Sequence, residues 1–83
     1  MLTVSVISPE KVLFEGSVES LVAPAFDGEV GILSQHAPMM TLLGKGELRL
    51  GPDGSAGRFL IAGGFLQVLN DNVRVVTESA APR

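Results

Sequence analysis

The sequence has no cysteine, tryptophan or tyrosine, and it has only four phenylalanines in 83 residues. Without cysteine, the chain can form neither a disulfide nor a thiolate metal site. Stability must therefore come from packing of aliphatic side chains. The hydrophobic content of 46% is enough for the core of a small sandwich or barrel.

Charge is also scarce. Charged residues make up 18% of the chain and the net charge is −3. The six cations are scattered rather than clustered: Lys11, Lys45, Arg49, Arg58, Arg74 and Arg83. Because a phosphate-binding face needs grouped cations, nucleic acid is not expected as a partner. A composition this apolar in a small domain instead indicates a surface that another protein covers.

Long hydrophobic runs are absent too. No run approaches the roughly 20 apolar residues of a membrane span, and Met1–Thr3 begins no signal peptide. The expected protein is soluble and intracellular or organellar, with attachment to a membrane through another protein left open.

Apolar and polar residues alternate with a period of two along most of the chain, which predicts strands. The expected strands are 2–7, 12–14, 18–23, 39–43, 47–50, 58–62, 65–69 and 73–77, with turns at Gly16–Ser17, Gly51–Gly54 and Asn70–Asn72. Gly63–Gly64 predicts a bulge or a close approach of two backbone segments. This pattern favours an antiparallel all-β sandwich or barrel, with residues 1–83 as one domain.

Two strands are apolar on both faces, Met39–Leu43 and Phe59–Ala62. The favoured interpretation is that both lie centrally and are covered on both sides within the chain. The alternative is that a partner covers one side. The adjacent Met39 and Met40 suit that alternative, because flexible thioethers adapt to a partner surface.

The segment Pro24–Pro38 holds two glycines, two prolines, two acids and the only histidine. As a fifteen-residue connector it is longer than strands require, so it predicts an unusual corner or a surface that a partner contacts. Asp27, Glu29 and His36 offer too few ligands for a metal site, and no nucleophile accompanies them. The chain is therefore not expected to be an enzyme or to hold a metal.

His36 precedes Ala37–Pro38, and the proline holds the residue before it in an extended conformation. The chemistry alone favours a hydrogen bond from this histidine to the neighbouring loop backbone. The alternative is a contact with a partner that responds to pH, because imidazole titrates near neutrality.

The order of these motifs resembles the epsilon subunit of rotary F-type ATP synthases, which is called delta in mitochondria. The resemblance is carried by Gly28-Glu29-Val30-Gly31-Ile32-Leu33, His36-Ala37-Pro38, Gly46, Val6-Ile7-Ser8-Pro9-Glu10, Val12-Leu13-Phe14-Glu15-Gly16, Ile61-Ala62-Gly63-Gly64-Phe65, Val68 and Asn72-Val73. It covers about residues 2 to 80.

The resemblance implies a flattened β-sandwich of ten strands at the foot of the central stalk. Such a domain packs against the gamma subunit, rests on the membrane ring of c subunits and rotates with both, without catalysis, cofactor or bound nucleotide. The residues that match c-ring contacts are Gly28, Glu29 and Val30. Those that match gamma contacts are Ser8 and His36, continued by Met39, Met40 and Thr41.

The family usually continues into a helical hairpin that regulates rotation and binds ATP in some members. This sequence ends at residues 77–83, where that hairpin would begin, which indicates a short member or one domain of a longer protein. The resemblance thus implies coupling on the cytoplasmic face of a bacterial inner membrane, or its organelle equivalent. The alternative from another class is a free-standing β-barrel that binds a small ligand in the 24–38 loop.

Overall fold

The computed structural model describes residues 1–82, and its regular structure consists of strands. They are β1 (Leu2–Ile7), β2 (Val12–Val18), β3 (Ser20–Ala25), β4 (Gly28–Leu33), β5 (Met39–Leu42), β6 (Lys45–Leu50), β7 (Gly57–Ala62), β8 (Phe65–Leu69), β9 (Asn72–Val76) and β10 (Ser79–Pro82). Across residues 1–82, no helix has both the length and the hydropathy needed to cross a bilayer.

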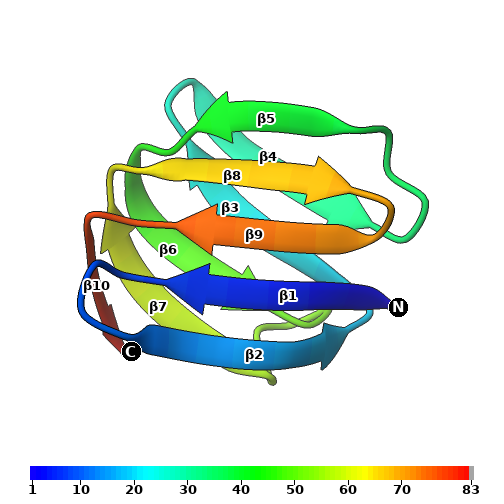
Figure 1. Cartoon of the computed structure of the whole chain (residues 1–83), viewed down its shortest axis with the longest axis horizontal. Helices are drawn as coiled ribbons and strands as arrows, with labels where there is room; N and C mark the ends of the chain where they lie inside the picture. Colours follow the sequence, from blue (N-terminus) through cyan, green and yellow to red (C-terminus); the bar gives the residue numbers. More distant parts are fainter. Residues whose placement is uncertain (83) are drawn as a thin grey trace.

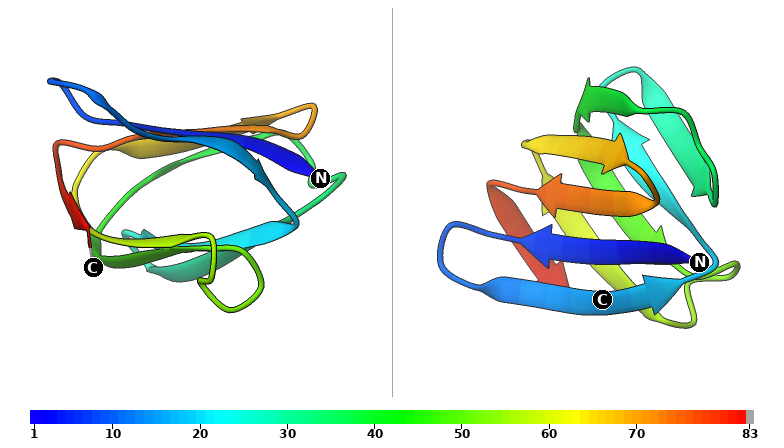
Figure 2. Two further views of the ribbon diagram at one scale, coloured as in Figure 1. Left: turned by 90° about the horizontal axis from the view of Figure 1, so that it is seen from below. Right: turned by 45° about the vertical axis from the view of Figure 1, so that its right-hand side comes forward.

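The strands form two five-stranded sheets that lie face to face (Figures 1 and 2). Sheet A has the order β2-β1-β9-β8-β5, and sheet B has the order β10-β7-β6-β3-β4. Neighbouring strands are antiparallel, apart from the parallel pair β1 and β9. The expected all-β sandwich is confirmed.

The core fills the space between the sheets and is almost entirely aliphatic. Its buried hydrophobic residues are Leu2, Val4, Val6, Val18, Leu21, Ala23, Ile32, Leu43, Leu48, Leu50, Phe59, Ile61, Leu66, Val68, Val73 and Val75. Within most strands these residues occupy every second position, because successive side chains point to opposite faces. Phe59 is the only aromatic ring among them, which matches the low aromatic content of the sequence.

A tight corner forms where the chain passes from β7 in sheet B to β8 in sheet A. Gly63 and Gly64 both have positive φ, +75° and +104°. A side chain on Gly64 would collide with the backbone of Val76 and Thr77. The buried Thr77 hydroxyl lies 2.9 Å from the carbonyl oxygen of Ser79 and 3.1 Å from that of Gly63, either of which can accept its proton. The close backbone approach expected at the glycine pair is confirmed.

The segment 24–38 is not a fifteen-residue loop, so that prediction is wrong. β3 runs to Ala25, a turn at Phe26–Asp27 follows, and β4 occupies Gly28–Leu33 in register with β3. In β4 only Val30 and Ile32 follow the alternating apolar pattern of a strand. Gly31 stands between them, and Gly28 and Glu29 precede them. Glycine is depleted in strands, which explains why the pattern resembles a loop.

The bend expected at Gly16–Ser17 is also absent. Both residues lie inside β2, where Gly16 pairs with Val4 and Ser17 with Thr3, and the chain leaves the strand only at Glu19. The ring of Phe14 lies 3.2 Å from the position that a Cβ on Gly16 would occupy. Glycine here makes room for an aromatic ring over the strand.

Neither of the two apolar strands is covered on both faces, so the favoured interpretation is wrong for both. β5 is the outermost strand of sheet A, and the side chains of Met40 and Leu42 are each 64% exposed. β7 lies between β6 and β10, but Leu60 on its outer face is 45% exposed. The outer side of each strand is therefore left partly or largely exposed by the chain itself.

The turn expected at Gly51–Gly54 is confirmed as part of the β6–β7 connection, where Asp53 is held by its neighbours. The hydroxyl and the N–H of Ser55 lower the pKa of the Asp53 carboxyl, and Arg58 adds a smaller effect in the same direction. The interactions with the charged carboxylate stabilise the folded state, and this stabilisation is fully present at pH values above the unfolded-state pKa of about 3.9. It is lost as the pH falls through the lower pKa of the folded state.

We expect replacement of Ser55 by alanine to raise the pKa of Asp53 toward its ordinary value, because one hydrogen bond to the carboxylate is lost. An NMR titration of the side-chain carboxyl carbon measures this. Glu19, an exposed acid elsewhere on the chain, serves as the internal reference. An unchanged Asp53 titration would contradict the assignment to Ser55.

Candidate functional site: a partner-binding edge

The β3–β4 hairpin ends in a turn that reaches toward the other sheet. The N–H of Phe26 donates to the carbonyl oxygen of Leu42 on β5 at 3.0 Å, and the Phe26 ring is exposed. Gly28 follows with φ of +129° and open space where a Cβ would stand. This turn therefore joins the outer strands of the two sheets, β4 and β5, into one edge of the sandwich. We call residues 26–42 the β4–β5 edge.

Among the three predicted c-ring contacts, Glu29 has the most exposed side chain. Its side chain is 60% exposed, and its carboxylate pairs with the guanidinium of Arg49 on β6 at 3.3 Å. Val30, by contrast, is half-buried and packs against the core. Gly28 contributes backbone only. The geometry therefore singles out Glu29 in this trio.

The connection between β4 and β5, residues 34–38, is held at several points. The backbone N–H of His36 donates to the Leu33 carbonyl oxygen at 3.2 Å, and its Nδ1 lies 2.7 Å from the carbonyl oxygen of Ala37. Gln35 has φ of +66°, and its N–H donates to the Asp71 carboxylate at 2.6 Å. His36 is half-buried and makes the backbone hydrogen bond that the sequence favoured.

On β5, the three predicted contact residues differ in what they present. Met40 is exposed on the outer face, whereas Met39 is half-buried and packs against the core. Thr41 is also half-buried, and its hydroxyl lies 3.4 Å from the Leu42 carbonyl oxygen. Of these three residues, Met40 is the one that is mostly exposed.

Ser8 lies away from the other predicted gamma-contact residues. Its hydroxyl donates to the Lys11 carbonyl oxygen at 3.2 Å, and it lines a cleft together with Glu78. β9 and β8 separate β1 from β5 in sheet A. The β1–β2 and β4–β5 connections also lie at opposite ends of the strands (Figure 1). Ser8 and His36 therefore occupy opposite corners of the molecule.

Sequence reasoning missed a row of apolar residues that runs across the outer face of sheet A. Ile7, Val76, Phe65 and Leu42 are register partners on four adjacent strands, β1, β9, β8 and β5. They are half-buried or exposed on the face away from the core. No local pattern marks such a row, because it needs the strand order. The only signal was the apolar character of Met39–Leu43 on both faces.

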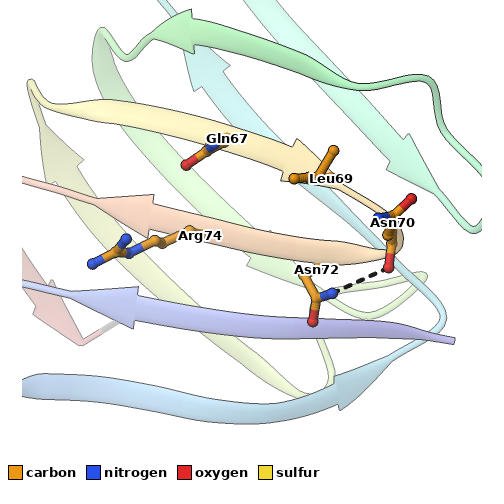
Figure 3. A pocket seen from close by; sticks show the side chains of 5 residues that line it. All are labelled: Gln67, Leu69, Asn70, Asn72 and Arg74. Carbon is orange, nitrogen blue, oxygen red and sulfur yellow. Dashed lines mark hydrogen bonds between the residues drawn. The ribbon is translucent and has the colours of Figure 1, made fainter.

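A shallow cavity of about 210 Å³ lies on the same face near the β8–β9 turn (Figure 3). Its lining consists of Gln67, Leu69, Asn70, Asn72 and Arg74, and the Asn72 side-chain amide donates to the Asn70 carbonyl oxygen at 3.2 Å. Among residues 1–82 there is no group of three or more histidine or acidic residues placed to hold a metal.

Comparison with known proteins is consistent with this geometry. The sequence matches the family described as "ATP synthase, Delta/Epsilon chain, beta-sandwich domain" over residues 1–83. It is 42% identical over 80 residues to the ATP synthase epsilon chain of Leptospira borgpetersenii, covering 96% of this chain and 63% of the relative. It is 40% identical over 79 residues to that of Synechocystis, covering 95% and 58%. The chain spans about three fifths of the length of these curated relatives.

Two solved assemblies contain chains of the same fold. One belongs to the OSCP/F1/c-ring structure of the Euglena gracilis mitochondrial ATP synthase, with a TM-score of 0.87 and 23% identity over 98% of this chain and 52% of that one. The other belongs to the central stalk and c-ring structure from Tetrahymena thermophila, with a TM-score of 0.79 and 19% identity over 96% and 65%.

Proposed function

The chain belongs to the family of ATP synthase delta and epsilon chains, and on this premise we propose that it acts as a non-catalytic central-stalk subunit of a rotary ATP synthase. In this role it couples the gamma subunit to the membrane c ring during proton-driven ATP synthesis. The observation that carries the proposal is the family match over the whole chain, together with relatives named ATP synthase epsilon chain.

The proposed c-ring contact is Glu29 with the adjacent Gly28 and Val30. An exposed carboxylate beside a tight hairpin turn suits contact with the polar loops of another protein. The turn at Phe26–Asp27 projects next to it, so the contact area extends beyond a single side chain.

The proposed gamma contact consists of Ser8, His36, Met39, Met40 and Thr41. A partner that touches both Ser8 and His36 has to cover the outer face of sheet A from corner to corner. The apolar row from Ile7 to Leu42 crosses that face, and the exposed Met40 adds an adaptable side chain. Stable protein interfaces bury about 800 Å² on each partner, which needs a broad face of this kind.

The proposed mechanism is mechanical. Torque passes through noncovalent contacts, and neither a cofactor nor a nucleotide on this domain is part of the proposal. Membrane association is indirect, through the assembled complex, on the cytoplasmic face of a bacterial inner membrane or its organelle equivalent.

The competing hypothesis was a small-ligand site in the 24–38 loop. That hypothesis depended on a long loop, and the structure has the β4 strand there instead. Three cavities of about 210 to 270 Å³ lie elsewhere on the surface, and none of the three is lined by residues 24–38. We therefore do not favour this hypothesis.

Two substitutions test the proposed contacts in the assembled ATP synthase. We expect Glu29→Lys to weaken binding to the c ring by about tenfold or more, because reversing a charge opposite a complementary surface is strongly unfavourable. We expect His36→Trp to weaken binding to gamma, because the larger ring would occupy space that the partner needs at the proposed contact and cannot keep the imidazole Nδ1 contact with the Ala37 carbonyl oxygen. Co-purification with gamma measures the effect of His36→Trp, and co-purification with the c ring measures that of Glu29→Lys. Proton-coupled ATP synthesis in membrane vesicles should fall in both variants.

Asp53→Lys is the matched control for charge reversal. Asp53 is an exposed acid in the β6–β7 connection, outside every proposed contact, so this variant should assemble and couple normally. If Glu29→Lys and His36→Trp behave like the control, the proposed contacts are wrong.

A further inference from the structure

The outer face of sheet B carries a connected row of charges that alternate in sign. From the edge inward, the row is Glu29 on β4, Arg49 and Glu47 on β6, and Arg58 on β7. The Arg49 guanidinium lies 3.3 Å from the Glu29 carboxylate and 3.8 Å from that of Glu47. Glu47 in turn lies 3.6 Å from Arg58. Arg49 is therefore the link between the exposed edge and the interior of the row.

Arg49 reaches Glu29 across an intervening strand. Arg49 is aligned with Val22 on β3, and Glu29 is aligned with Pro24 on the same strand. One nitrogen, Nη2, faces both carboxylate oxygens of Glu29, at 3.3 and 3.4 Å. The guanidinium thus fixes the direction of a side chain that otherwise stands on the outermost strand of the sheet.

The surroundings of Arg49 explain why it can hold Glu29 in place. Side-chain exposure falls from 60% at Glu29 to 34% at Arg49 and 17% at Glu47. Glu47 sits deepest and pairs with both arginines, so Arg49 is held from its inner side. A flexible glutamate on an exposed edge loses rotamer freedom when a fixed cation binds it.

We propose that Arg49 is the positioning residue for Glu29: it pre-orients the carboxylate that the c ring contacts. This inference rests on the proposed function, because it assigns a role at the Glu29 contact. It adds a residue from β6 to a site otherwise built from the β3–β4 hairpin. Pre-orientation improves binding because less side-chain freedom is lost when the partner arrives.

A positioning role differs from a structural one in what it predicts. Arg49 pairs with Glu29 at 3.3 Å and with Glu47 at 3.8 Å, and partly exposed ion pairs of this kind contribute little to folding. Glu47 also keeps Arg58 as a partner, so the fold should tolerate loss of the Arg49 charge. Loss of the Arg49 charge should instead weaken binding to the c ring, and it should do so only in a protein that still has Glu29. The two residues should therefore show coupled effects on binding and nearly unchanged thermal stability.

The experiment compares Arg49→Gln, Glu29→Gln and the double variant in reconstituted ATP synthase, with binding to c-ring vesicles as the readout. Interaction energies between coupled residues lead us to expect about three- to tenfold weaker binding for Arg49→Gln. The double variant should bind no more weakly than Glu29→Gln alone. Arg49→Lys should restore part of the affinity, since it returns the charge but not the planar fork.

Arg58→Gln is the matched control, because it removes a cation from the same row that does not touch Glu29. It should change binding by less than about twofold, as expected for a surface substitution away from the contact. NMR relaxation of the Glu29 side chain in the free protein should show greater mobility in Arg49→Gln but not in Arg58→Gln.

The outcomes separate this inference from the function on which it rests. If Glu29→Gln weakens binding and Arg49→Gln does not, or if their effects simply add, the positioning role is wrong and the contact stands. If Glu29→Gln leaves binding unchanged, the c-ring contact itself is wrong, and the role of Arg49 at that contact is overturned with it.

Discussion

Replacing Gly64 with alanine should destabilise the domain by about 3–5 kcal/mol, from strain at a positive φ together with overpacking. Its φ is +104°, and a Cβ there would lie 2.7 Å from the Thr77 Cα and closer still to the Val76 carbonyl oxygen. Both obstacles are backbone atoms, so no side chain can move aside. Stability of about 0.05–0.15 kcal/mol per residue makes this a large part of the total. Denaturant unfolding monitored by circular dichroism measures the loss.

Two other glycines in β4 separate the causes. Gly28 has a positive φ of +129° but open space around it, so Gly28→Ala should show the conformational strain alone, about 1–3 kcal/mol. Gly31 has open space and no positive φ, so Gly31→Ala should change stability little. If Gly64→Ala unfolds at the same denaturant concentration as Gly31→Ala, the close approach does not constrain this corner.

Replacing Leu48 with alanine should cost about 2–5 kcal/mol, the range for deleting a buried leucine side chain. Leu48 is fully buried on β6, near the middle of sheet B, and its register partner is the core residue Phe59. Removing three carbons there leaves a cavity that a strand paired on both sides cannot readily close. Thermal unfolding should show a drop of about 4–8 °C for each kcal/mol in a domain of this size.

The neighbouring strand provides the control. The same leucine-to-alanine substitution can be made at Leu60 on β7, which is 45% exposed. Leu60→Ala should therefore lower the free energy of unfolding by less than about 1 kcal/mol, because this side chain buries little apolar area. Equal losses for Leu48→Ala and Leu60→Ala would mean that the inward and outward faces of sheet B are assigned wrongly.

The parts of the fold that sequence predicted are those with a local cause. The β8–β9 turn followed from Asn70 and Asp71, two residue types that tolerate the positive φ they adopt here. The inward faces of β1 and β9 followed from alternation. β4 escaped prediction because glycines interrupt its alternation, and β10 because Ser79–Pro82 has no strong strand signal. These misses arise from tertiary pairing that overrides weak local preference.

In the candidate site too, residues in a local motif could be predicted from the sequence, whereas contacts between distant strands could not. Glu29 and His36 could be named because they stand in a compact motif. The partnership of Glu29 with Arg49 could not, because it joins β4 to β6 across β3 and depends on the register of three strands. The apolar row from Ile7 to Leu42 likewise exists only when β1, β9, β8 and β5 are side by side. Long-range strand order has no signature in neighbouring residues.

The parallel pairing of β1 with β9 has a consequence for how the chain folds. Thr3 pairs with Asn72, so β1 pairs with an inner neighbour that is far away along the chain. During synthesis, the inner edge of β1 must stay unpaired until β9 has emerged from the ribosome. Closure of so long a loop is slow relative to local pairing. We therefore expect docking of the β1–β2 hairpin onto β9 to be the late, rate-limiting step of folding.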